Sequence, residues 1–346
     1  MAKKDLSMQI EVHDVDHGQC VVLTGPTGQT LMLDCGRSLV RPWFPSITYM
    51  GKRIDTLIAL NLDEDHVADL PGLWKDCSIG GFCSNPTVTA QHLAAMKSGG
   101  GMGRGVKQAH EILQRHGPGG IGDWTNGLGG IAWQAFHNVA GQDFTDTNNL
   151  SLAVFVRFCE FTILFGGDLE KEGWLTLLRN PAFRTRLSEV KVYVASHHGR
   201  DNGCCHELFQ YMRPELVIFS DGQKQYETQE TIDWYRVRAK GKVIMSQASG
   251  LASQPLRKVL TTRRDGSIRI NVGRDGSYSV LPEKARSPEL THLNALAGLV
   301  AANPLGLRPI SSSKPTVHNA FSQLPHPNIP PVASALGIAV RRFLGS

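Results

Sequence analysis

The run Ile54-Asp55-Thr56-Leu57-Ile58-Ala59-Leu60 leads directly into Asn61-Leu62-Asp63-Glu64-Asp65-His66, and this junction decides the fold. The first part is mostly apolar, which is typical of a short buried strand. The second part crowds three carboxylates and one imidazole into a single loop. Like charges this close repel each other, and a bound divalent cation removes that repulsion. A solvated acidic loop before a helix is the plain alternative.

Two further apolar segments end in polar groups of the same kind. Residues 161–165 lead into Gly166-Gly167-Asp168, and residues 190–195 lead into Ser196-His197-His198-Gly199. Imidazole is the commonest metal ligand in proteins. The alternatives are a helix-capping turn at Asp168 and a polar loop with one surface histidine. Because sites in layered α/β proteins gather where strand ends meet loops, we expect the three endings to converge.

Short strands and helices are expected around these junctions. The expected strands cover residues 8–15, 20–24, 30–33, 87–90, 131–136, 150–158, 216–219, 242–245, 268–272 and 278–280, the last two as late edge strands. The expected helices begin near Val67 and cover residues 92–96, 106–115, 170–178 and 231–239. The sequence therefore predicts one folded domain over residues 1–282.

The character of the sequence changes near Pro282. Seven prolines lie between Pro304 and Pro331 among serines and asparagines, which indicates a linker or tail with little regular structure. A short helix over residues 332–344 is expected to close it. We therefore assign residues 283–346 to a Pro-rich tail and expect that its removal leaves thermal unfolding nearly unchanged.

The composition fits a globular enzyme. A chain of 346 residues with 41% hydrophobic residues can bury a sizeable core, and 19% charged residues argues against wholesale disorder. The net charge of +5 fits a nucleic-acid partner and fits a slightly basic enzyme equally well. The sequence leaves protein partners and the oligomeric state open.

The location in the cell is predicted from three features. Seven cysteines occur without a CxxC motif, which indicates reduced thiols in a cytoplasm. The first residues are polar and contain no apolar region of a signal peptide. The apolar tract over residues 293–307 is broken by Asn303-Pro304 and is too short to span a bilayer. We therefore expect a cytoplasmic protein without a membrane partner.

Seven short motifs follow one another in the chain. They are Asp14-Val15-Asp16-His17-Gly18-Gln19, Leu33-Asp34-Cys35-Gly36, Asn61-Leu62-Asp63-Glu64-Asp65-His66, Gly122-Asp123-Trp124, Asn148-Asn149-Leu150-Ser151-Leu152, Gly166-Gly167-Asp168 and His197-His198-Gly199-Arg200. In this order the chain resembles the metallo-β-lactamase superfamily, and within it the stand-alone relatives of the ComEC-type nuclease domain of DNA-uptake proteins. The resemblance covers about residues 8–272. It implies an α/β fold, an αββα four-layer sandwich with two mixed β-sheets flanked by helices.

The chain departs from this family in its metal motif. The family has HxHxDH, and the first two histidines are here Asn61 and Asp63, whereas the Asp-His pair is intact as Asp65 and His66. A later Tyr-Gly-His-Pro segment stands here as Gln225-Tyr226-Glu227-Thr228, so its histidine is missing.

The resemblance implies two sets of metal ligands. The ligands of one ion would be Asp65, His66, Asp168 and either His197 or His198. The ligands of the other would be rich in oxygen, namely Asn61, Asp63, Asp168 and, as a further candidate, Asn148. Oxygen ligands suit Mn²⁺ or Mg²⁺ better than Zn²⁺. We expect one tightly and one weakly bound divalent ion, or a single ion, with the choice among Zn²⁺, Mn²⁺ and Mg²⁺ open.

The first functional hypothesis is a metal-dependent hydrolase, namely a phosphodiesterase or nuclease that uses metal-activated water on nucleic acid or a nucleotide. Asp65 would hold the metal and orient the water, and Asp168 would bridge two ions. Whichever of His197 and His198 is not a ligand would protonate the leaving oxygen. Asp34 is a candidate for orienting a ligand from behind.

Two other hypotheses stay open. The chain is a hydrolase of a small ester or amide with the same fold, or it is a degenerate relative with a scaffold or regulatory role. The second of these is motivated by Asn61 and Asp63, where the family has histidines. Metal content separates the enzymes from the scaffold, and substrate screening separates the two enzymes.

Overall fold

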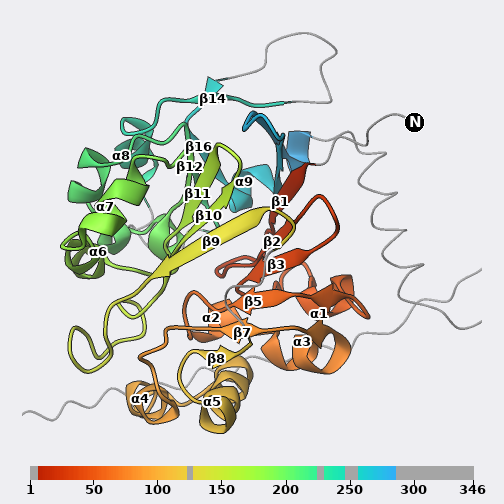
Figure 1. The fold of residues 1–346 in the computed structure, drawn as a ribbon, viewed down its shortest axis with the longest axis vertical. Helices are drawn as coiled ribbons and strands as arrows, with labels where there is room; N and C mark the ends of the chain where they lie inside the picture. Colours follow the sequence, from red (N-terminus) through yellow and green to blue (C-terminus); the bar gives the residue numbers. More distant parts are fainter. Residues whose placement is uncertain (1–6, 123–127, 224–229, 246–255, 286–346) are drawn as a thin grey trace, which may run out of the picture. The chain divides into compact units, whose positions relative to one another are not determined.

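The computed structural model describes residues 7–122, 128–223, 230–245 and 256–285. Asp123 and Trp124 of one motif, residues 225–228 and the expected tail from residue 286 onward lie outside the described residues, so the predictions about them stay predictions. In the described part, two mixed β-sheets lie face to face and helices cover their outer faces (Figure 1).

The first sheet has eight strands in the described part. In spatial order they are β18 (Tyr278–Pro282), β17 (Ile268–Val272), β1 (Met8–Val12), β2 (Val21–Thr24), β3 (Thr30–Leu33), β5 (Thr56–Ile58), β7 (Phe82–Cys83) and β8 (Gly120–Ile121). The strands β3, β5 and β7 are parallel to one another, and the other neighbours are antiparallel. Along β1 and β17 buried side chains alternate with half-buried ones, the period of two that predicted these strands.

The second sheet has six strands in the described part. In spatial order they are β16 (Val259–Thr261), β13 (Leu216–Phe219), β12 (Val192–Val194), β11 (Phe161–Phe165), β10 (Ala153–Phe158) and β9 (Ile131–Phe136). The first four are parallel, and β9, β10 and β11 form an antiparallel meander. Every residue of β11 is buried, as expected for a strand covered on both faces.

Three hydrophobic clusters lie between the layers. The central cluster joins the inner faces of the two sheets. The second packs the first sheet against α3 (Leu70–Asp76), α4 (Ala90–Met96) and α5 (Arg104–His116). The third packs the second sheet against α6 (Lys171–Leu177), α7 (Pro181–Leu187) and α8 (Ile232–Arg236). The predicted αββα sandwich with two mixed sheets is therefore confirmed.

Shorter elements complete the described part. The helices are α1 (Pro45–Thr48), α2 (Glu64–Val67) and α9 (Thr262–Asp265), with 3₁₀ turns η1 (Ser196–Gly199), η2 (Asp201–Gly203), η3 (Glu207–Gln210) and η5 (Glu283–Ala285). Two small ribbons pair β4 (Arg53–Ile54) with β6 (Ser78–Ile79) and β14 (Lys242–Val243) with β15 (Leu256–Arg257). None of the helices in the described ranges is long and apolar enough to cross a membrane.

Three sequence expectations were wrong in detail. Residues 87–90 are not a strand, because Asn85 accepts hydrogen bonds from the backbone N–H and hydroxyl of Thr87, and Thr89 forms a capping box with His92 at the start of α4. Such local bonds compete with strand pairing. The expected strand over 54–60 is divided at Asp55 between β4 and β5. The strand β17 is not an edge strand, since it lies between β18 and β1.

The parallel strands of both sheets bring the polar loops together. Asp34 follows β3, residues 61–66 follow β5, Asp168 follows β11, residues 197–198 follow β12, and Ser220 follows β13. Each of these residues therefore stands at the carboxyl end of a parallel strand. This arrangement gives one site with contributions from both sheets.

The effect of truncation near Pro282 on stability should depend on whether residues 283–285 are kept. Glu283 donates its N–H to the Ser267 carbonyl at 2.7 Å and accepts from the Ser267 N–H through its carboxylate at 2.9 Å. A chain ending at residue 285 should melt at the full-length temperature. A chain ending at 282, the boundary taken from the sequence, should not be neutral as expected there but should lose about 2 kcal/mol of unfolding free energy, at about 1 kcal/mol per bond. Thermal unfolding of both truncations is the measurement, and a large loss in the longer one would show that the tail packs on the domain.

Candidate metal centre

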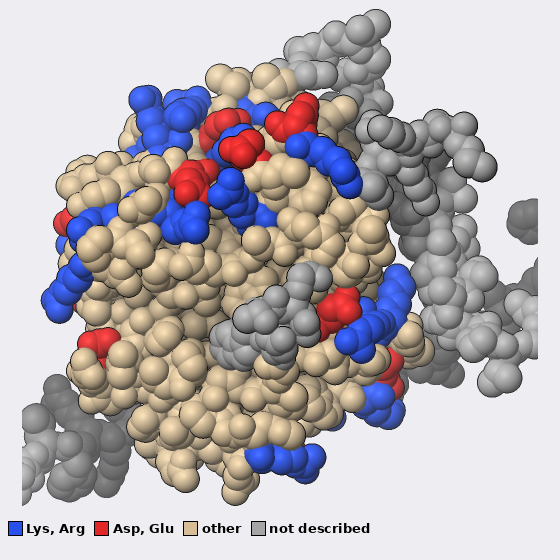
Figure 2. Space-filling model, viewed as in Figure 1, with Lys and Arg blue, Asp and Glu red and all other residues tan. Residues whose placement is uncertain are grey.

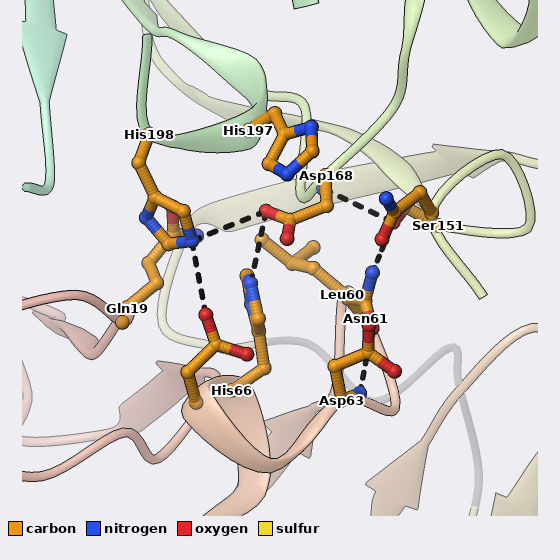
Figure 3. A network of polar contacts seen from close by, with 12 residues as sticks. Gln19, Leu60, Asn61, Asp63, His66, Ser151, Asp168, His197 and His198 are labelled. Carbon is orange, nitrogen blue, oxygen red and sulfur yellow. Dashed lines mark hydrogen bonds and ion pairs between the residues drawn. The ribbon is translucent and has the colours of Figure 1, made fainter. Parts of the chain in front are cut away.

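Four side chains form one compact cluster at this edge of the sheets. The ligand atoms of Asp65, His66, Asp168 and His198 all lie within 4.8 Å of one another. The Nε2 of His66 is 2.9 Å from Asp168 Oδ1, and the Nε2 of His198 is 3.2 Å from Asp65 Oδ2 and 3.5 Å from Asp168 Oδ1 (Figure 3). The helix α2 supplies Asp65 and His66, and the second sheet supplies the other two.

Both imidazoles of the cluster are oriented by a contact at Nδ1, the ring nitrogen that points away from the carboxylates of Asp65 and Asp168. The Nδ1 of His66 is 2.8 Å from Asp34 Oδ2, and the Nδ1 of His198 is 2.7 Å from the carbonyl oxygen of Ser220. Each ring therefore directs its Nε2 towards the two carboxylates. Metal-binding histidines are oriented in this way, with the second ring nitrogen bonded to a carboxylate or a backbone carbonyl.

The residues fit a divalent cation. The Nε2 of His198 is buried without a hydrogen-bond partner. Two imidazole nitrogens and two carboxylates within reach of one point are a donor set suited to Zn²⁺ or Mn²⁺. Three of the four residues are buried and Asp65 is half-buried, so one side of the cluster meets solvent.

The carboxylates of the cluster favour a positive charge on the groups between them. Burial opposes the charged form of His66, but the carboxylates of Asp168, Asp34 and Asp65 outweigh it and raise the pKa of His66 well above its usual value. Burial likewise opposes a charge on His198, and Asp168 and Asp65 raise its pKa. For Asp168, burial opposes ionisation, but the charges of His66 and His198 lower its pKa. Because ligands bind metals in their deprotonated form, metal binding here is coupled to proton release.

The sequence left open which histidine of the pair joins the cluster, and the structure places His198 there. The Nδ1 of His197 lies 3.6 Å from Glu170 Oε1, and its Nε2 accepts a hydrogen bond from Arg200 at 3.3 Å. Burial lowers the pKa of His197. His197 therefore lies beside the cluster and not in it.

The backbone at the pair is strained. His197 has φ 50° and His198 has φ 55°, both in the left-handed region, and Gly199 follows with φ 76°. Left-handed backbone costs a residue other than glycine about 1–2 kcal/mol. The N–H of His197 donates to the carbonyl of Gly167 at 2.9 Å, which holds the turn against the loop that carries Asp168. This turn directs the two adjacent side chains to different partners.

Asn61 and Asp63, expected as ligands of a second ion, have other partners. The Oδ1 of Asn61 accepts from the N–H of Asp63 at 2.6 Å, and its Nδ2 donates to Ser151 Oγ at 3.1 Å. Asp63 forms an ion pair with Lys97 and accepts from Thr147 Oγ1 at 3.0 Å. In Figure 3, Asn61 and Ser151 lie on the opposite side of Asp168 from His198.

Asn148, the further candidate, also bonds elsewhere, since its Nδ2 donates to Glu170 Oε1 at 3.0 Å. Sequence reasoning missed three residues that contact the candidate ligands, namely Lys97, Ser220 and Glu170. Only Glu170 could have been suspected, because an acid two residues after Asp168 shares its loop. Lys97 and Ser220 reach the centre through tertiary packing alone.

Replacing Asp34 tests whether its hydrogen bond with His66 strengthens metal binding. It has φ 58°, a conformation that asparagine also tolerates, so Asp34→Asn removes the charge without a backbone conflict. The variant should bind Zn²⁺ about 10- to 100-fold more weakly, the usual effect of losing such a partner. Competition with a chromophoric chelator measures the affinity. Asp55→Asn, at the bend between β4 and β5, is the matched control, and equal affinities for the two variants would contradict the role of Asp34.

Similarity to known proteins is found among solved structures. No family model and no curated protein matches the chain. A CmlA beta-hydroxylase mutant is 14% identical with a TM-score of 0.38, and the match covers 66% of this chain and 48% of that one. The metallo-beta-lactamase fold protein YhfI from Bacillus subtilis is 10% identical with a TM-score of 0.41, covering 77% of this chain and 99% of that one.

A long form RNase Z from yeast is 9% identical with a TM-score of 0.31, covering 87% of this chain and 44% of that one. The chain spans about half the length of the first and the last of these three proteins. The αββα layers and the two mixed sheets agree with the metallo-β-lactamase-type sandwich that was predicted, and the cluster of Asp65, His66, Asp168 and His198 lies at the carboxyl ends of its parallel strands.

Proposed function

We propose that the chain is a metal-dependent hydrolase whose centre is held by Asp65, His66, Asp168 and His198. The observation that carries this proposal is the orientation of the two imidazoles, each with Nδ1 bonded outward and Nε2 directed at the carboxylates. A divalent ion in such a centre lowers the pKa of water and polarises the oxygen of the group that is cleaved.

The side chains around the centre have distinct roles in this proposal. Asp65 is the half-buried ligand, so its carboxylate accepts a hydrogen bond from the attacking water and orients it. The Nε2 of His197 accepts from Arg200, so its proton is on Nδ1, a buried nitrogen without a hydrogen-bond partner. In this neutral form the Nδ1–H would stabilise the leaving oxygen through a hydrogen bond, and full proton transfer would need an imidazolium that no longer accepts from Arg200.

A phosphodiester is the proposed substrate class, in nucleic acid or a nucleotide. One cationic side chain supports it, since the guanidinium of Arg200 donates to His197 beside the centre. Guanidinium and ammonium groups favour anionic phosphate. On the face shown in Figure 2, Lys and Arg lie among Asp and Glu, so the surface there has no field of one sign. The preference for phosphate therefore depends on Arg200, close to the centre.

The test is a matrix of substrates and metals on the full chain. The protein is stripped with a chelator, reloaded with Zn²⁺, Mn²⁺ or Mg²⁺, and assayed on bis(p-nitrophenyl) phosphate, DNA, RNA and p-nitrophenyl acetate. We expect phosphodiester cleavage with at least one ion and none in the stripped protein or in Asp65→Ala. Cleavage of the ester alone would assign the ester-hydrolase alternative. A folded protein that binds no metal and cleaves nothing would leave the scaffold role.

A further inference from the structure

We infer that the centre takes one divalent ion and not two, because the ammonium group of Lys97 occupies the place beside Asp63 that a second ion would need. The inference rests on the proposed metal centre and specifies its composition. It concerns the three oxygen-bearing residues that the sequence offered to a second ion, Asn61, Asp63 and Asn148.

The carboxylate of Asp63 is fully engaged. Its Oδ1 pairs with Lys97 Nζ, and its Oδ2 accepts from Thr147 Oγ1 at 3.0 Å. Lys97 Nζ also donates to Thr147 Oγ1 at 3.2 Å, which closes a triangle of three side chains. The side chains of Lys97 and Asp63 are only 20% and 24% exposed, so solvent screens the pair far less than it screens a surface ion pair.

Asn61 presents the wrong atom to a cation. Its Oδ1 accepts from the N–H of Asp63, so its NH₂ group points towards Ser151. Ser151 Oγ in turn accepts from the N–H of Asp168 at 3.0 Å. An amide NH₂ is a donor and cannot ligate a metal ion. Asn61 therefore acts as a brace that positions the loop of Asp168 through Ser151, as Figure 3 shows.

The charges of Lys97 and Asp63 also argue against a second metal ion. A second dication at Asp63 would lie beside the fixed positive charge of Lys97, and like charges at contact distance repel strongly in a partly buried site. Lys97 already neutralises Asp63, so a second ion would gain little there. In the altered motif, the ammonium group of Lys97 thus stands in the place of a second metal ion. Lys97 lies at the carboxyl end of α4, where a lysine also suits the helix dipole.

Metal counting on the full chain tests the inference. The protein is loaded with Zn²⁺ or Mn²⁺, dialysed, and analysed by elemental mass spectrometry and native mass spectrometry. The wild type should hold one ion per chain. Lys97→Met keeps the apolar stem and removes the charge, so it should take up a second, weaker ion as Mn²⁺ reaches millimolar concentration. Lys97→Arg and the exposed control Lys107→Met should stay at one.

Two aspartates of the same loop give an independent readout. Asp63→Asn should keep one ion at wild-type affinity, whereas Asp65→Asn should lose it. Two ions in the wild type would overturn this inference and leave the proposed centre intact, whereas none in a folded wild type would remove both. Lys97→Met at one ion with an unchanged melting temperature would overturn the role of Lys97. If that variant does not fold, loss of the ion in Asp63→Asn decides against the inference.

Discussion

Replacing Asp168 by asparagine is expected to remove the bound ion and to lower the rate of hydrolysis roughly 10³-fold or more, because several kcal/mol of charge stabilisation depend on it. Its Oδ1 contacts both imidazoles of the centre. Asparagine keeps the shape of the side chain and the backbone bond to Ser151 but replaces the charge with a neutral amide. The measurements are kcat/KM on a phosphodiester with the most active ion and the metal content of the purified variant.

A nearby aspartate provides the control for this prediction. Asp201 is exposed in η2, three residues after His198, and Asp201→Asn should retain both the ion and the rate. Thermal unfolding of both variants shows whether they fold. If Asp168→Asn is folded, holds its ion and cleaves at the wild-type rate, the assignment of the centre is wrong.

The largest effect on stability is expected from Trp174→Ala, a loss of about 3–5 kcal/mol of unfolding free energy, as for other buried aromatic residues cut to alanine. Trp174 is fully buried between α6 and the second sheet, with Phe183 at 6.1 Å and Tyr193 at 6.3 Å between ring centroids. Its Nε1–H donates to Ser196 Oγ at 3.0 Å. Denaturant titration followed by circular dichroism measures the loss.

A second variant separates packing from positioning. Trp174→Phe retains most of the apolar contact but loses the bond to Ser196, at about 1 kcal/mol. Ser196 directly precedes the strained histidine pair, so this variant should also bind Zn²⁺ more weakly than the wild type. A loss of less than 1 kcal/mol in Trp174→Ala would show that the third hydrophobic cluster is not closely packed around it.

The sequence was sufficient where the signal is local. An apolar segment followed closely by Asp65 and His66, by Asp168 or by the histidine pair shows a buried strand and a polar ending within 13 residues or fewer. The carboxyl ends of parallel strands share an edge, so convergence of these endings follows from the pattern. The four layers were predicted from the resemblance to the metallo-β-lactamase superfamily, and the period of two along β1 and β17 agrees with them.

The rest depended on contacts between distant residues. The choice between His197 and His198 is made by two left-handed residues and by the carbonyl of Ser220, 22 residues further along the chain. The partner of Asp63 is Lys97, 34 residues away at the end of a helix. Neither Ser220 nor Lys97 belongs to a recognisable sequence motif, because backbone carbonyls and lysines at helix ends are common in all proteins. The sequence therefore predicted candidate ligands for two ions. It did not predict Lys97, the cation that we infer excludes the second ion.

Because His197 and His198 have a strained left-handed backbone, directed evolution for heat resistance and directed evolution for activity should favour different residues at these positions. Glycine adopts φ values near 50° without steric conflict, so His197→Gly relieves the backbone of one strained residue. A library selected only for survival at high temperature would enrich such changes and discard the Nδ1–H beside the centre. Selection rounds that alternate heating with a screen for turnover would keep the imidazoles. Engineers of this chain should therefore look for stabilising changes in the outer helices and leave the corner after β12 alone.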